Sequence, residues 1–341
     1  MRRFEWTSAT SLATALRAGS VTVAAAMAPA PAAANAVILK AGGIDLLDLM
    51  KEELLAPQRI VTLRGIPELG RIAEEPGGGL RIGAMVTLAQ LAGDPLVRAR
   101  YGALAQAAGQ SASPQIRHVA TLGGNLLQRP RCWYFRSIHH DCARKGGRQC
   151  FAFMGENQYH AIFGQNGCAI VHPSTAATAL VAFDASVDLV DARGARRTVA
   201  LENFLLGPEV DLQRENSLAP GEILTAVLLP GPKPGVRSFH LRQGELDSFD
   251  WPIADVAVVL ELGRDGICQR ARVVLGAAAP VPYRARGAES ALAGQRIAED
   301  TARSAAIAAM AGATPLSKNA YKVPVFEALV RRAILGAAGQ A

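Results

Sequence analysis

Four cysteines stand close together in the middle of the chain, and their type and spacing could support chemistry. Cys132, Cys142, Cys150 and Cys168 follow the spacing C-x9-C-x7-C-x17-C, whereas the fifth cysteine, Cys268, stands alone. This spacing matches neither the C-x2-C pairs of zinc ribbons nor the tight C-x2-C runs of ferredoxins. The number and proximity of the thiols, rather than a stock motif, therefore indicate a shared ligand.

Three structures would satisfy these cysteines: an iron–sulfur cluster, a tetrahedral zinc site, or two disulfides in an exported protein. Basic residues outnumber acidic ones around them, which favours an anionic cluster. The aromatic run WYF after Cys132 would keep water away from the sulfurs. All three structures remain open from the residues alone. Because four thiolates complete a tetrahedral site, we expect the nearby histidines to lie at the surface or behind the ligands. These are His118, His139, His140, His160 and His172.

Two glycine pairs form the second chemical feature. They lie in AGGIDLLDLM, residues 41–50, and in TLGGNLLQ, residues 121–128. The first pair lies between an expected strand, AVILK, and an expected helix, LLDLMKEEL. Main-chain N–H groups in such turns can surround an anion, and a following helix adds its dipole. Neither segment has the GxGxxG pattern of dinucleotide-binding folds, so for each pair taken alone an ordinary turn or helix cap is favoured over an anion site.

Composition and charge narrow the possible classes. The chain has 341 residues, of which 50% are apolar, and this is long enough for two or three subdomains. The formal charge of +7 comes mainly from scattered arginines and aromatic residues are few, so we expect no nucleic-acid partner. The longest apolar region, residues 21–39, is rich in alanine and contains prolines, so we expect no membrane span. The N-terminus lacks the apolar stretch of a secretory signal, which predicts a cytoplasmic location.

Nearly the whole sequence resembles the FAD-binding medium subunit of the molybdenum hydroxylases, the xanthine oxidase family. The glycine and cysteine regions and several further segments follow the family order. These include LRIGAMVTLAQLAGDPLV, IRHVATLGGNLLQRPRCWYF, HPSTAATALVAFDA, PGEIL, SFDWPIADVAV, LGAAAPVPYRA and NAYKVPVFEALVRRAI. The insert between GGNLLQR and HPS resembles that of the FAD subunit of periplasmic aldehyde oxidoreductases, where four cysteines hold a [4Fe–4S] cluster. A comparable cluster occurs in the flavin subunit of hydroxybenzoyl-CoA reductases.

The resemblance implies an α+β fold. A two-subdomain FAD-binding region of the vanillyl-alcohol-oxidase/PCMH type would precede a C-terminal α+β domain similar to that of CO dehydrogenase flavoproteins. We expect FAD-binding subdomains over residues 1–57 and 58–228, with the iron–sulfur insert at about 129–170 of this sequence. The segment 229–235, rich in proline and glycine, would mark a boundary. Residues 236–341 would form the C-terminal domain, with a three-stranded sheet and helices.

The resemblance also implies the cofactor-binding residues. The FAD-binding residues would be Gly42, Gly43, Ile44, Asp45, Leu46, Leu47, Thr121, Gly123, Gly124, Asn125, Gln128, Thr175 and Arg242. The ligands of the cluster would be Cys132, Cys142, Cys150 and Cys168. The sequence departs from the family pattern at Ile44, His118 and Thr175, where a small polar residue, an asparagine and an aspartate are usual. Arg242 takes the position of a common lysine.

The implied complex is a heterotrimer. A small subunit with two [2Fe–2S] clusters and a large molybdenum-cofactor subunit would pass electrons to FAD, and a terminal acceptor would reoxidise it. No catalytic residue is expected in this chain, because the family's hydroxylation occurs at molybdenum in the large subunit. An aldehyde is the expected substrate of the complex, and co-export with a partner that bears a signal would place it in the periplasm. Two other hypotheses are a stand-alone flavoprotein oxidase and a zinc-stabilised scaffold that has lost FAD.

Overall fold

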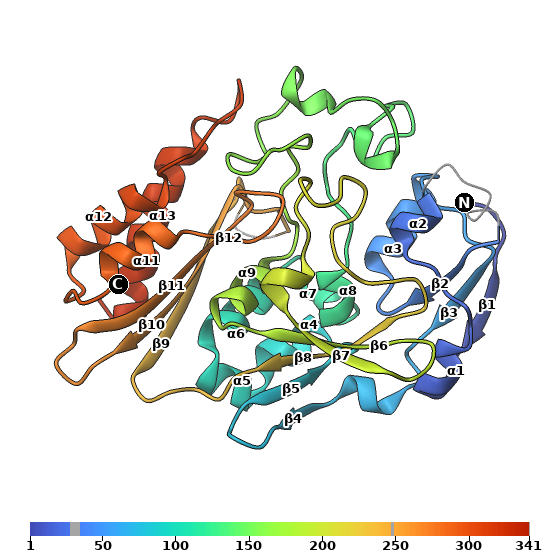
Figure 1. The fold of residues 1–341 in the computed structure, drawn as a ribbon, viewed down its shortest axis with the longest axis horizontal. Coiled ribbons are helices and arrows are strands. Elements are labelled where there is room, and N and C mark those ends of the chain that lie inside the picture. The colour runs from blue at the N-terminus through green and yellow to red at the C-terminus, as the bar shows by residue number, and fades with distance from the viewer. Residues whose placement is uncertain (28–34, 247–248, 341) are drawn as a thin grey trace.

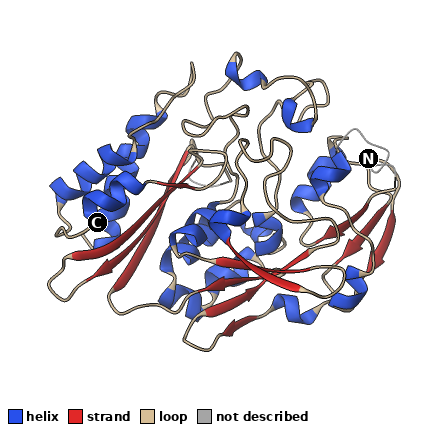
Figure 2. Ribbon diagram, in the orientation of Figure 1, coloured by secondary structure: helices blue, strands red, loops and turns tan. Residues whose placement is uncertain are grey.

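The protein is an α+β chain built on three β-sheets (Figures 1 and 2). The structure, a computed structural model, describes residues 1–27, 35–246 and 249–340, so part of the apolar region near the N-terminus lies outside it. Within these ranges, no helix is long and apolar enough to cross a membrane.

The first sheet is parallel, with strand order β1-β3-β2. Its helix α3 directly follows β2 through the first glycine pair and buries Leu46, Leu49 and Met50 in a core shared with Ile38 and Ile60 of the sheet. The strand, glycine turn and helix predicted from the sequence are therefore present. The elements of this part are β1 (Glu5–Ser8), α1 (Leu12–Leu16), α2 (Val23–Met27), β2 (Val37–Lys40), α3 (Ile44–Lys51) and β3 (Arg59–Thr62).

The second sheet is antiparallel and has strand order β4-β5-β8-β6-β7. Helix α9 contacts the C-terminal sheet and packs in one core with the second sheet, and all eight of its residues are buried. This burial explains why the helix is apolar except at its two threonines, Thr175 and Thr178. The elements are η2 (Pro67–Gly70), β4 (Ile72–Glu74), β5 (Leu80–Gly83), α4 (Leu88–Gly93), α5 (Pro95–Arg100), α6 (Gly102–Gln110), α7 (Pro114–Arg117), α8 (Leu122–Leu126), α9 (Thr175–Ala182), β6 (Ser186–Val190), β7 (Arg196–Ala200), α10 (Leu201–Phe204) and β8 (Ile223–Leu229).

The third sheet is antiparallel, with strand order β12-β11-β10-β9. Helices α11 to α13 cover one side of it, and α6 and α9 contact it from the other (Figure 1). The expected three-stranded sheet is present as β9 to β11, with the two-residue β12 added at one edge. The elements are β9 (Val236–Gln243), β10 (Ala254–Leu262), β11 (Cys268–Gly276), β12 (Tyr283–Arg284), α11 (Arg286–Leu292), α12 (Glu299–Ala309) and α13 (Lys322–Ala338).

The cysteine-containing segment between α8 and α9 has little regular structure. Its only helices are the short 3-10 turns η3 (Ala143–Lys145) and η4 (Phe151–Phe153). The segment lies between the N-terminal elements and the C-terminal helices (green in Figure 1). Phe135 packs it into the core of the first sheet, and Asn319 Nδ2 donates to the carbonyls of His160 and Ala161 at 3.0 and 3.1 Å. The segment is therefore held in place by side-chain contacts to the first sheet and to the C-terminal region, because it has no strands to pair with either.

Candidate cofactor sites

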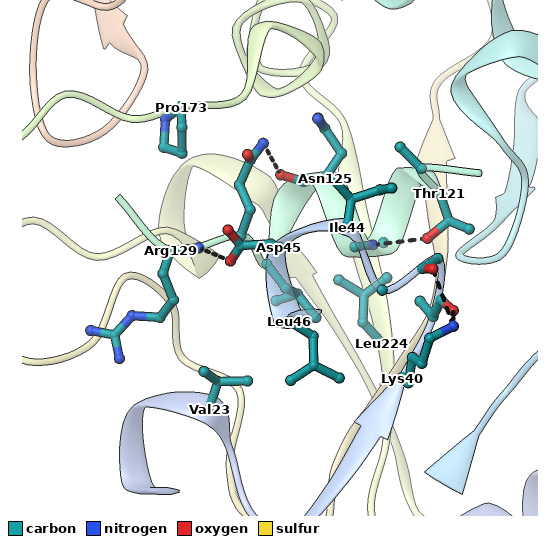
Figure 3. Close-up of a pocket in the computed structure, with 18 of the residues that line it drawn as sticks. Val23, Lys40, Ile44, Asp45, Leu46, Thr121, Asn125, Arg129, Pro173 and Leu224 are labelled. Carbon is teal, nitrogen blue, oxygen red and sulfur yellow. Dashed lines mark hydrogen bonds between the residues drawn. The ribbon is translucent and has the colours of Figure 1, made fainter. Parts of the chain in front are cut away.

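A cavity of about 610 Å³ lies where the first two sheets meet the edge of the third. All the residues expected to contact FAD line it: those of the β2–α3 turn and the start of α3, those of α8 and the residues around it, Thr175 and Arg242. Figure 3 shows several of these side chains around the cavity. The structure thus brings together residues that are far apart in the sequence.

The β2–α3 turn presents free main-chain donors to this cavity. Gly43 has a φ of 91°, a left-handed conformation that favours glycine. Within the described part of the chain, no acceptor receives the N–H groups of Ile44, Asp45 or Leu46 in the first turn of α3. The helix dipole adds positive potential at this end. The turn therefore has the hydrogen-bond donors and the positive electrostatic potential that favour the binding of an anion.

Lys40 adds positive charge beside the β2–α3 turn. The sequence alone did not identify this residue. Its Nζ donates to the carbonyls of Gly42 and Ala41 at 3.1 and 3.3 Å. Burial lowers the pKa of Lys40, and the nearby charge of Arg64 adds to this effect. The position of a lysine two residues before a glycine pair is the sequence signal that could have identified it.

The second glycine pair forms the start of a helix, one of the alternatives expected for it, rather than an open anion-binding turn. Gly123 and Gly124 lie inside α8, whose N-cap is Thr121. The N–H groups of Leu122 and Gly123 donate to the carbonyls of Val86 and Ala84 at 2.8 and 2.9 Å. The N–H of Gly124 donates to Thr121 Oγ1 at 3.2 Å. These donors are already engaged, so this pair serves the start of a helix rather than an open anion site.

Close packing explains the glycines themselves. A Cβ on Gly123 would lie 2.8 Å from Cβ of Ala84, and a Cβ on Gly42 would lie 2.2 Å from the carbonyl oxygen of Val119. Neither distance is tolerated by a real side chain. Gly42 therefore allows the β2–α3 turn to lie directly against the segment that leads into α8.

The polar side chains on the opposite wall are mostly bonded to one another. Ser174 Oγ donates to Asn125 Oδ1 at 2.5 Å, and Gln128 Nε2 donates to the carbonyl of Asn125 at 2.9 Å. The hydroxyls of Thr175 and Ser111 are 2.5 Å apart and buried. Thr175 thus lines the cavity while its hydroxyl is engaged within the protein.

The carboxylate of Asp45 points to the cysteine segment. It accepts from the main-chain N–H of Arg129 at 2.8 Å (Figure 3). It also accepts from Arg136 Nη2 at 2.6 Å. Arg131 lies 2.9 Å from the same carboxylate. Asp45 is therefore bonded to the start of the insert, and its main-chain N–H, not its side chain, is what remains for a ligand.

The four clustered cysteines are free thiols that influence one another. Burial raises the pKa of Cys132 to about 12, and the charges of Cys142 and Cys168 contribute in the same direction. Burial also raises the pKa of Cys142, and interaction with Cys168 raises that of Cys150. These three thiols stay protonated unless a metal or cluster binds the thiolate. A hydrogen bond from Cys150 and the charge of Arg144 instead lower the pKa of Cys168 to about 6. Among the described residues, no three His, Cys, Asp or Glu side chains are arranged to hold a metal ion.

Arg144 is a buried residue of this site that amino-acid composition alone could not distinguish from the other basic residues. Arg144 Nε donates to Cys168 Sγ at 3.4 Å, and its Nη1 donates to Glu215 Oε1 at 2.8 Å. The side chain is fully buried, and its Nη2 has no hydrogen-bond partner in the described structure. A buried cation with a free donor beside thiols fits an anionic cluster larger than one ion.

A second cavity, of about 290 Å³, adjoins the first. The two share Arg131 and Trp251 among their lining residues, and the smaller one reaches Cys132 and His160. His160 Nε2 lies 3.2 Å from Cys132 Sγ. The space lined by the glycine segments therefore extends to Cys132.

Known proteins share this sequence and fold. Residues 2–232 match the family model "FAD binding domain in molybdopterin dehydrogenase", and residues 240–337 match "CO dehydrogenase flavoprotein C-terminal domain". The chain is 35% identical to the aldehyde oxidoreductase FAD-binding subunit PaoB of Escherichia coli (strain K12), over 83% of this chain and 86% of the relative. It is 29% identical to the carbon monoxide dehydrogenase medium chain of Hydrogenophaga pseudoflava, with 87% of each chain covered.

Solved structures agree with these matches. A carbon monoxide dehydrogenase from Hydrogenophaga pseudoflava superposes with a TM-score of 0.74 at 26% identity, with 100% of this chain and 99% of the other covered. Quinoline 2-oxidoreductase from Pseudomonas putida 86 gives a TM-score of 0.73 at 25% identity, with 99% and 98% covered. The chain therefore belongs to the FAD-binding medium subunits of the molybdenum hydroxylases, oxidoreductases whose hydroxylation takes place on another subunit.

Proposed function

We propose that this chain is the electron-transfer subunit of a heterotrimeric molybdenum hydroxylase and that it carries a [4Fe–4S] cluster beside its FAD. The observation behind the proposal is the fully buried Arg144, which donates to Cys168 and is ion-paired with Glu215 on the wall of the FAD cavity. An anionic cofactor on the four cysteines would satisfy this charge.

The β2–α3 turn would hold the pyrophosphate of FAD. Its free N–H groups at Ile44, Asp45 and Leu46, with the charge of Lys40 behind them, supply donors and positive potential. Asn125 and Gln128 would form the polar wall opposite, and Arg242 would close the side toward the C-terminal sheet. FAD supplies the capacity to accept and release electrons, while these residues bind and orient it.

The four thiols and the buried guanidinium beside them favour an iron–sulfur cluster over zinc. Electrostatic coupling links all four thiols, and Arg144 Nε donates to Cys168 Sγ at 3.4 Å. A cubane of iron and sulfide adds sulfide acceptors to the four thiolates, which a single zinc ion does not. Cys132, Cys142, Cys150 and Cys168 would be its ligands.

The complex would be an aldehyde oxidoreductase, a proposal supported by the relative of 35% identity. Its other members would be a small subunit with two [2Fe–2S] clusters and a large molybdenum-cofactor subunit. Electrons would reach FAD from these subunits and leave to a terminal acceptor. Location would follow from the partners, since a signal on another subunit could export the folded complex. Cell fractionation with and without that signal distinguishes a periplasmic from a cytoplasmic complex.

Cofactor content tests the proposal directly. The complex is purified anaerobically, and FAD, iron, zinc and acid-labile sulfide are measured per copy of this chain, with the partners' iron determined separately. We expect one FAD and about four irons and four sulfides on this chain. C132S should lose that iron, whereas C268A, which alters the lone buried cysteine, should keep it. One zinc and no flavin would overturn the proposal and favour a structural scaffold.

A further inference from the structure

We infer that Arg144, oriented by Glu215, sets the reduction potential of the cluster, with Arg144 as a donor to the sulfur of Cys168 and Glu215 as a positioning residue. The inference rests on the proposed function, because it requires the cluster. It goes beyond that function by assigning a role to two residues that are not among the predicted ligands of the cluster or the predicted FAD-binding residues.

The side chain of Arg144 is held rigidly from two sides. Its Nε donates to Cys168 Sγ at 3.4 Å, and its Nη1 donates to Glu215 Oε1 at 2.8 Å and to the carbonyl of Arg214 at 3.4 Å. The side chain has 0% exposure, so solvent does not screen its charge. The planar guanidinium is therefore fixed beside Cys168, and its buried Nη2 has no hydrogen-bond partner in the described structure.

Glu215 also binds a second buried arginine. Arg129 lies with Nε 2.9 Å from Glu215 Oε2, and its side chain is 3% exposed. The three side chains together carry one net positive charge, from two arginines and one glutamate. Arg129 and Glu215 line the FAD cavity, whereas Arg144 contacts Cys168. One buried network therefore runs from the flavin side to the cysteine side.

This network predicts the direction of a shift in potential. Reduction of the cluster adds negative charge, so a buried positive charge and an N–H···S bond stabilise the reduced form. R144Q removes the charge and should lower the potential. E215Q keeps a side-chain oxygen as acceptor but removes the negative charge beside Arg144, and should raise the potential. A purely structural role would not give shifts of opposite sign.

The experiment is a redox titration of the purified heterotrimer, followed by the EPR signal of its reduced [4Fe–4S] cluster, with the flavin and the partner clusters as internal references. At a fixed ambient potential, R144Q should have about a tenfold lower ratio of reduced to oxidised cluster, which is about 59 mV for a one-electron couple. E215Q should shift the ratio the other way. R148Q is the matched control, because Arg148 lies in the same segment with its side chain 94% exposed, and it should not shift.

Iron and sulfide analysis of every sample separates this inference from the proposed function. If the wild-type chain holds no cluster, the proposed function and the inference both fail. If the cluster is intact and neither R144Q nor E215Q moves its potential, or both move it alike, the inference alone fails. If R144Q does not assemble the cluster, R144K and E215Q decide. R144K retains the charge but not the two-sided hydrogen bonding, and should give a smaller decrease than a tenfold change.

Discussion

The Oδ2 atom of Asp45 accepts a hydrogen bond of 2.8 Å from the main-chain N–H of Arg129. Asp45 lies in the first turn of α3 on the FAD cavity, and Arg129 precedes the first cysteine ligand that we propose. The same carboxylate binds Arg136 at 2.6 Å. The insert is therefore fastened to the helix that would hold the FAD pyrophosphate, so the two sites are expected to depend on each other.

Replacement of Asp45 tests this dependence. D45A removes the acceptor of the Arg129 N–H and the carboxylate acceptor of the buried Arg136, which keeps the carbonyl of Arg129 as a partner. A lost hydrogen bond to a charged group costs about 1.5–3 kcal/mol. We expect a loss of unfolding free energy of that size in urea, together with lower content of both FAD and iron. D48N is the control, because the Asp48 side chain is 43% exposed and its ion pairs should contribute only about 0–1 kcal/mol. Loss of FAD with full retention of iron would show that the sites are independent.

Gly42 should be intolerant of any side chain. In G42A the new Cβ would lie 2.2 Å from the carbonyl oxygen of Val119, so the β2–α3 turn must move away from α8. Overpacking of this kind costs about 1–3 kcal/mol. We expect a lower melting temperature and faster release of FAD, followed by the rise in flavin fluorescence. G93A, where no atom lies within 4 Å of the new Cβ, should behave as wild type. A G42A variant that retains FAD as wild type does would refute the role of this close approach.

Local patterns in the sequence predicted the first glycine segment, because strand, turn and helix there follow one another within a few residues. The second segment could not be predicted in this way. Its first amides are fixed by the carbonyls of Val86 and Ala84, which are distant in sequence. Whether a glycine pair opens an anion site or begins a packed helix depends on such tertiary acceptors.

The cysteine site illustrates the same limit. Number and proximity of the cysteines predicted a shared ligand, and composition predicted positive charge around it. Which arginine faces the thiols depends on Glu215, which lies in the loop between α10 and β8 and has no motif around it. The nearby basic residues differ greatly: Arg144 is fully buried, whereas the Arg148 side chain is 94% exposed.

Trp251 should control access to the flavin. Its ring contacts the guanidinium of Arg131 at 4.7 Å and lines both cavities. A contact of this type at a partly exposed site is worth about 0.5–1 kcal/mol. W251A should therefore release FAD about two- to fivefold faster in a stopped-flow dilution experiment. W251F keeps an aromatic face and should differ little from wild type. Equal release rates for W251A and wild type would mean that the ring does not restrain the cofactor.

Lys322 makes stability depend on pH. It is fully buried, and burial lowers its pKa to about 7 from an ordinary 10.5. Its Nζ donates to the carbonyls of His160 and Ala277 at 3.1 and 2.5 Å, and a neutral amine still supplies both donors. Below pH 7 the folded and unfolded states both carry the proton, so the fold bears the full cost of a buried charge. Above pH 7 only the unfolded state keeps it, so the unfolding free energy rises with pH.

Comparison with K322M isolates this contribution. The wild-type unfolding free energy should rise relative to that of K322M between about pH 7 and pH 10, with a slope of up to about 1.4 kcal/mol per pH unit. Urea titrations at half-unit pH intervals measure the slope. K318M removes a neighbouring lysine whose side chain is 47% exposed, and its difference from wild type should be flat over the same range. A flat difference for K322M as well would mean that Lys322 remains charged in the fold, with its cost offset by the two carbonyls.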